Sequence, residues 1–195
     1  MARDDTLLAL SYAVRLPVVL KYLGQLALAL AVLTLPPLLA ALWFLDHGLA
    51  WRLLLVILLT GGVGAVLSHL PAPARLQVNE ALVITALAFA GCALLMTWPL
   101  MAAGIGFSAA LFEAVSAVTT TGLSTLASVE QMPPAFLFTR AWMQWYGGLG
   151  IVVLTVALLL GHRFATHRLV DPELHAENLA TTTRHYARRM LLVYV

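Results

Sequence analysis

Four long stretches of the chain contain no charged residue, and a charged residue stands at each end of every stretch. A helix that crosses a membrane needs about 20 mainly apolar residues. The first, second and fourth stretches each have the length of one crossing, whereas the third is too long for one and too short for two. The stretches lie between Lys21 and Asp46, Arg52 and Arg75, Glu80 and Glu113, and Arg140 and Arg163. This pattern predicts an all-α, polytopic membrane protein.

The third stretch predicts one crossing, followed by a helix that enters the membrane and stops. A break after Pro99 is marked by Gly104 and Gly106. It separates a crossing of roughly 81–101 from a second helix of roughly 107–118, which has about half the length needed to span a bilayer. We therefore expect two N-terminal transmembrane helices, then one unit of membrane helix, pore loop and membrane helix.

The first stretch contains a proline pair, Pro36-Pro37. Proline has no backbone N–H, and its ring clashes with the preceding turn of a helix. We expect the pair to kink the first crossing helix or to end its regular part.

Composition agrees with a protein embedded in lipid. Hydrophobic residues make up 62% of the chain and charged residues 10%, with a mean hydropathy of +0.92. Soluble domains carry about 25% charged residues. The net charge of +2 is too small to indicate a nucleic-acid partner. Membrane lipid is the partner that the composition predicts.

Lysine and arginine are distributed unevenly between the two sides of the predicted spans. Of the 11 such residues, only Arg52 and Arg140 fall on the side opposite to the N-terminus. Because positively charged short loops stay in the cytoplasm, we expect a cytoplasmic N-terminus and a loop after residue 118 that opens to the outer face. Tryptophans near span ends are expected at the membrane–water interfaces. These are Trp43, Trp51, Trp98, Trp142 and Trp145.

The segment Phe112–Thr125 reads FEAVSAVTTTGLST and places clustered hydroxyl residues and a glycine at membrane depth. Irregular backbone at that depth is tolerated only where it is buried in protein or lines a water-filled path. A short helix that leads into a Thr-Thr-Thr-Gly turn is typical of an ion-selectivity loop, whose carbonyls replace the water around the ion. The alternative is a kink in an ordinary packed helix, caused by hydroxyls that bond to their own backbone.

Backbone carbonyls of this turn are the candidate ion ligands. Gly122 is central because glycine readily adopts the backbone angles that turn successive carbonyls inward. The C-terminal end of the 107–118 helix contributes roughly half a negative charge. The candidate carbonyls are those of Thr119, Thr120, Thr121, Gly122 and Leu123.

Two charged residues, Glu113 and Arg140, are candidates for the pore mouth or for support of the loop. Glu113 is expected near the start of the short helix, where it attracts cations or caps the helix; we favour the cap. Arg140 opens the next span, where it hydrogen-bonds loop carbonyls, pairs with Glu113, or extends to the interface.

Small residues predict where helices approach closely, as they do in membrane packing. We assign this packing role to Gly147, Gly148 and Gly150, and likewise to Gly61, Gly62 and Gly64.

Chemistry other than transport has little support in the sequence. No recognisable pattern pairs a nucleophile with its base, so we expect no enzyme. The histidines after the last stretch lack the spacing of a zinc site; they are His162, His167, His175 and His185. We expect no bound cofactor, and no metal beyond a transported monovalent cation.

Two motifs, in order, resemble those of a known family. Phe112–Ser124 reads F-E-x-x-S-A-x-T-T-T-G-L-S, and Arg140–Leu154 reads R-x-W-x-Q-W-x-G-G-L-G-I-V-V-L. The chain resembles the N-terminal portion, with the first pore repeat, of the Trk-type membrane subunit in the Trk/Ktr/HKT potassium transporter superfamily.

This resemblance implies three segments. Residues 1–70 are a two-helix membrane extension, 71–161 the first membrane–pore–membrane repeat, and 162–195 a cytoplasmic connection that leads into a second repeat. In the family four such units surround a pseudo-fourfold axis, and each contributes one loop to a potassium filter. The remaining loops are supplied by the same polypeptide or by other copies.

The resemblance further implies potassium uptake across a bacterial plasma (inner) membrane. It also implies a homodimer at full length and a cytoplasmic nucleotide-binding regulatory subunit as a partner. The apolar residues 190–195 are expected to begin a further span that is cut off. The alternatives are a non-conducting fragment or structural membrane subunit, and a one-repeat channel subunit that must oligomerise.

Overall fold

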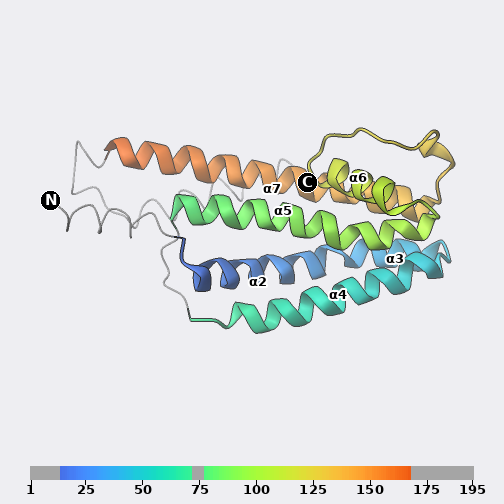
Figure 1. Ribbon diagram of the computed structural model, residues 1–195, viewed down its shortest axis with the longest axis horizontal. Coiled ribbons are helices and arrows are strands. Elements are labelled where there is room, and N and C mark those ends of the chain that lie inside the picture. The colour runs from blue at the N-terminus through green and yellow to red at the C-terminus, as the bar shows by residue number, and fades with distance from the viewer. Residues whose placement is uncertain (1–13, 72–76, 168–195) are drawn as a thin grey trace.

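Six α-helices make up most of the structure, a computed structural model that describes residues 14–71 and 77–167 (Figure 1). No strand occurs within these ranges, so the predicted all-α class is confirmed. Two single 3₁₀ turns, Met101–Ala103 and Val129–Gln131, lie in the connections. The helices are α2 (Leu16–Leu33), α3 (Leu35–Trp43), α4 (His47–Ser68), α5 (Val78–Leu100), α6 (Phe107–Val118) and α7 (Pro134–His167).

Three helical segments are long and apolar enough to cross a membrane, which confirms a polytopic membrane protein. They are Leu16–Trp43, His47–Ser68 and Asn79–Ala103. The fourth predicted crossing coincides with α7, which extends about 50 Å and exceeds the thickness of a bilayer core. The side chains of α7 beyond Ile151 lie outside the described residues.

The first crossing is a broken rod, as the proline pair predicts. α2 ends at Leu33, and α3 restarts at Leu35 with prolines in its first turn. Thr34, at the junction, is buried. α4 packs beside α2 over two glycines, since a Cβ atom on Gly64 would lie 2.8 Å from the carbonyl oxygen of Gly24. The two helices therefore approach through their backbones.

The short helix α6 spans Phe107–Val118, the range predicted from the sequence. Its length of about 18 Å is too small to cross a bilayer core of about 30 Å. It packs against both α5 and α7. The packing face carries Ala110, Ala114 and Ala117, each fully buried. Small side chains on this face let α6 sit close to its two neighbours.

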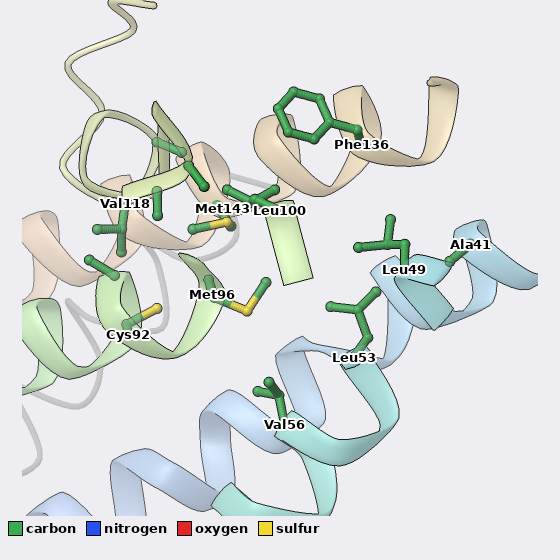
Figure 2. Close-up of a cluster of buried hydrophobic side chains, with 14 of the residues drawn as sticks. Ala41, Leu49, Leu53, Val56, Cys92, Met96, Leu100, Val118, Phe136 and Met143 are labelled. Atoms are coloured by element: carbon green, nitrogen blue, oxygen red, sulfur yellow. The ribbon is translucent and has the colours of Figure 1, made fainter. Parts of the chain in front are cut away.

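Two connections and the start of one helix lie at the same end of the molecule. The α3–α4 turn, the α5–α6 connection and the start of α7 lie together there (Figure 1). A buried cluster joins the helices behind this end, with residues from α3 to α7 (Figure 2). It includes Leu49, Leu53, Met96, Leu100, Phe136 and Met143. The N-terminal helices and the α5–α7 unit thus share one core.

The predicted segment boundaries stay predictions, and so does the orientation in the membrane. Of the predicted segment 162–195, the residues from 168 on lie outside the described residues.

Gly64→Ala is expected to destabilise the protein by about 1–3 kcal/mol, because the added methyl group overlaps backbone atoms of α2. Thermal unfolding of the purified protein in detergent measures the change. Gly62→Ala is the matched control in the same helix, since nothing lies within 4 Å of its added Cβ atom. Equal unfolding midpoints for the two variants would contradict the close crossing of α2 and α4.

Candidate functional site

The chain leaves the helical conformation directly after Val118 and does not regain an α-helix until Pro134. Two residues of the following turn have positive φ angles, +59° at Thr120 and +77° at Gly122. Glycine adopts such angles readily, whereas for a β-branched threonine they are a genuine outlier. Strained backbone of this kind clusters at functional sites, where surrounding contacts hold it.

The structure excludes the alternative of a kinked, continuous helix. Thr119 does donate its hydroxyl back to the carbonyl of Val115, at 2.7 Å, as that alternative supposed. The residues after it nevertheless form a turn and an irregular loop. The hydroxyl bond therefore closes the end of α6 instead of bending a longer helix.

Ser116 secures the turn from inside α6. Its carbonyl accepts the backbone N–H groups of Thr121 at 2.9 Å and Gly122 at 3.4 Å. Its hydroxyl donates to the carbonyl of Leu123 at 2.5 Å. One buried serine thus holds three consecutive residues. Ser116 is not among the predicted site residues, although it stands in the motif three residues before the Thr-Thr-Thr-Gly turn.

The carbonyls of the turn divide into two kinds. Those of Thr119, Thr120, Thr121 and Gly122 accept no hydrogen bond from any described residue, and all four residues are exposed. The carbonyl of Leu123 instead accepts two bonds, from Ser116 and from Arg140. Both lone pairs of that oxygen are used. The carbonyl of Leu123 thus differs from the other four: its role as an ion ligand stays a prediction, and we leave it out of the ligands proposed below.

Glu113 lies in the middle of α6, so its expected position at the helix start was wrong. Its side chain is fully buried. One carboxylate oxygen accepts the hydroxyl of Ser124 at 2.6 Å and the backbone N–H of Thr125 at 2.9 Å. The other accepts Nε of Arg140 at 2.8 Å. Glu113 thus holds the loop after the turn; it neither caps α6 nor faces solvent.

Arg140 links α7 to the same loop. Its side chain is 12% exposed and makes an ion pair with Glu113. Its terminal amino group also donates to the carbonyl of Leu123 at 2.9 Å. Of the three alternatives for Arg140, the structure thus shows the loop contact and the ion pair together. A buried pair is stabilised by further hydrogen bonds to its charged groups, and here the loop supplies them from Ser124 and Thr125 to the carboxylate and from the guanidinium to Leu123.

Gly147 in α7 packs directly against the C-terminal end of α6. A Cβ atom at this position would lie 2.0 Å from the carbonyl oxygen of Val118, so only glycine fits. A Cβ atom on Gly150 would lie 3.4 Å from the ring of Phe89 in α5, an ordinary contact distance. Gly148 is half-buried. The packing role is therefore most stringent at Gly147, directly behind the turn.

Comparisons with known proteins place the site in context. The sequence model of a family described as TrkH, cation transport protein, matches residues 53–194. A Trk system potassium uptake protein TrkH from Halomonas elongata is 37% identical over 74% of this chain and 31% of its own length. The Escherichia coli K12 protein of that name is 52% identical over 26% of the chain and 10% of its own length.

A third relative, an uncharacterized cation transporter from Methanocaldococcus jannaschii, is 27% identical over 91% of the chain and 38% of its own length. The chain spans about a third of the length of the Halomonas and Methanocaldococcus relatives. Proteins of these kinds are transporters, so the prediction that the chain is not an enzyme is confirmed.

Glu113→Gln is expected to lower the free energy of unfolding by about 3–5 kcal/mol, because it leaves the buried charge of Arg140 without its partner. Chemical denaturation in detergent measures the loss. Glu130→Gln, at an exposed acid in the same loop, serves as the control and should change little. A Glu113→Gln protein as stable as the control would show that the ion pair contributes nothing.

Gly147→Ala is expected to displace α6 and to destabilise the protein by about 3 kcal/mol, since the added methyl group meets backbone that cannot rotate away. The control is Gly91→Ala in α5, where nothing lies within 4 Å. Thermal unfolding of both variants compares them directly. Similar midpoints would mean that α6 does not rest on α7 at this point.

Proposed function

The chain belongs to the TrkH family of cation transport proteins, and we propose that it supplies one backbone-carbonyl loop of a potassium-selective pore in a bacterial plasma membrane. The ligands are the carbonyls of Thr119, Thr120, Thr121 and Gly122. The observation that carries the proposal is that these four residues are exposed and their carbonyls accept no hydrogen bond from any described residue, on a turn held tightly from behind.

The depth of the turn supports this function. Val118 rests on Gly147, which lies about 20 Å along α7 from its first residue. We take α7 to begin at the membrane surface, and the turn then lies inside a bilayer core of about 30 Å. Unpaired carbonyls are too costly there unless they line a water-filled path. Exposure and depth together therefore favour an ion pathway.

The electrostatics favour a cation. The C-terminal end of α6 directs its partial negative charge toward the turn. Carbonyl dipoles then replace the water that a potassium ion sheds, without a full charge that would trap it. Glu113 is buried in its pair with Arg140 and supplies no free carboxylate. Neutral oxygens thus do the binding, and release stays easy.

One loop presents ligands from one side only. Three further loops are needed to surround an ion, and we propose that they come from other repeats of the same polypeptide or from other copies of the chain. Potassium itself is proposed from the relatives, two of which are named as potassium uptake proteins.

Several finer features belong to the same proposal. We place the N-terminus in the cytoplasm and the turn toward the outer face of the inner membrane. We assign no cofactor to the chain beyond the transported ion. A homodimer and a cytoplasmic nucleotide-binding regulatory subunit complete the assembly. A structural or non-conducting role is the alternative, and ion flux separates the two.

Gly122→Ala is the sharpest test of the turn. The added Cβ atom meets nothing closer than 3.8 Å, so the substitution acts through the positive φ alone. That strain is about 1–2 kcal/mol, and we expect the preference for potassium over sodium to fall by roughly tenfold. The measurement is uptake of both ions by a potassium-uptake-deficient bacterium that expresses the protein from its own gene.

Gly104→Ala is the matched control, because Gly104 has a φ of +81° and open space around it but lies outside the turn. It should suffer the same backbone strain and keep the ion preference. An unchanged preference in Gly122→Ala would refute the filter assignment. No potassium uptake by the unaltered protein would favour the non-conducting alternative.

A further inference from the structure

Two backbone carbonyls at the break between α2 and α3, those of Val32 and Leu33, lack their helical donors, because Pro36 and Pro37 have no N–H. In a continuous helix the carbonyl of Leu33 would accept the N–H of residue 37. That residue is Pro37, which has no N–H. Thr34 does not replace it, since its hydroxyl donates to the carbonyl of Leu30 at 2.7 Å.

A tryptophan from the pore unit supplies the missing donor. The indole Nε1 of Trp142 in α7 donates to the carbonyl of Leu33 at 2.7 Å. The indole is held in place by stacked rings on both sides, with Phe138 at 6.1 Å and Trp145 at 4.7 Å between ring centroids. The contact joins segments that are 109 residues apart in the sequence.

This position differs from the interfacial role expected for Trp142. The residue lies about 12 Å along α7 from its first residue and is half-buried against the core. Its polar atom bonds to a backbone carbonyl of α2, within a segment long enough and apolar enough to cross a membrane. Trp43, by contrast, is 83% exposed at the end of α3 and fits the interface.

Trp142 stands on the opposite face of α7 from the residues that hold the turn. Two residues along an α-helix correspond to a rotation of about 200°, so Arg140 and Trp142 point to opposite sides. Gly147 lies two turns from Arg140, on the same face as that residue. α7 is therefore fixed from one side by the turn and from the other by the helix break.

We propose that Trp142 is a positioning residue for the ion-binding turn: its bond to the Leu33 carbonyl sets the rotation and depth of α7, and through Gly147 and Arg140 the geometry of the carbonyls. The inference rests on the proposed function of the turn. The close seat of Val118 on Gly147 transmits any rotation of α7 directly to the end of α6. The proline break contributes to this positioning, because the missing N–H of Pro37 leaves the Leu33 carbonyl available to Trp142.

The test combines two substitutions. Trp142→Phe keeps an aromatic ring but removes the donor. Pro37→Ala restores a backbone N–H that can reach the Leu33 carbonyl. In the potassium-uptake-deficient bacterium, we expect Trp142→Phe to lower the potassium-to-sodium preference and the apparent potassium affinity by roughly two- to tenfold, the effect of one lost hydrogen bond.

Rescue distinguishes positioning from general packing. In the Pro37→Ala background, Trp142→Phe should lose much less selectivity, because Leu33 has another donor. Trp51→Phe is the control, at a half-exposed tryptophan with no indole hydrogen bond in the described structure, and should leave selectivity unchanged. A selective wild type whose Trp142→Phe variant keeps full selectivity would overturn the inference and leave the proposed function standing.

A second readout does not depend on transport. A double-mutant cycle of thermal stability compares four proteins purified in detergent: the wild type, Trp142→Phe, Pro37→Ala and the double variant. Coupling between positions 37 and 142 is expected, with Trp142→Phe less damaging when Pro37 is replaced. If Trp142→Phe lowered thermal stability equally in both backgrounds, the inference would be overturned, whether or not the wild type carries potassium. Absence of potassium uptake by the wild type would instead refute the proposed function.

Discussion

Backbone hydrogen bonding inside the membrane is the constraint on which the rest of this structure depends. A helix satisfies its own N–H and carbonyl groups. In the hydrocarbon core of a membrane, no water is present to bond these groups where a helix breaks. Within the described residues, the chain breaks after Leu33, inside a segment long enough to cross a membrane, and after Val118, at the end of α6. At the first break the indole of Trp142 supplies a donor to the carbonyl of Leu33. At the second break Ser116 and Arg140 bond the carbonyl of Leu123, and the turn carbonyls that accept no hydrogen bond from a described residue form the candidate ion site.

The buried pair of Glu113 and Arg140 shows how an expensive element is made stable. Removing two charges from water costs several kcal/mol for each ion, and attraction alone does not always offset that. Here the loop supplies further partners: Ser124 and Thr125 donate to the carboxylate, and Leu123 accepts from the guanidinium. The pair needs the loop and the loop needs the pair, so a half-formed arrangement is unfavourable. This mutual dependence favours one loop conformation.

Close packing in this protein relies on small residues, since lipid gives little hydrophobic drive for helices to associate. Glycines allow backbone contact at two places, between α2 and α4 and between α6 and α7. The sequence indicated glycine packing in general but not which glycine matters. Gly62 meets nothing, while Gly64 touches the backbone of α2. Gly62 and Gly64 are two residues apart, which on a helix is a rotation of about 200°, and only the packed structure identifies the partner.

The sequence by itself determined three of the four crossing segments, the bounds of α6, the break at the proline pair and the turn at Gly122. Each of these follows from local chemistry: runs of apolar residues, missing N–H groups and permissive backbone. Tertiary structure decided the contacts between distant residues. Glu113, expected to cap a helix, is buried and bonds to the loop. The carbonyl of Leu123 accepts two hydrogen bonds, and the indole of Trp142 bonds to the carbonyl at the break after α2. Hydrogen-bond partners far apart in the chain depend on how helices rotate against one another, and no local pattern specifies that rotation.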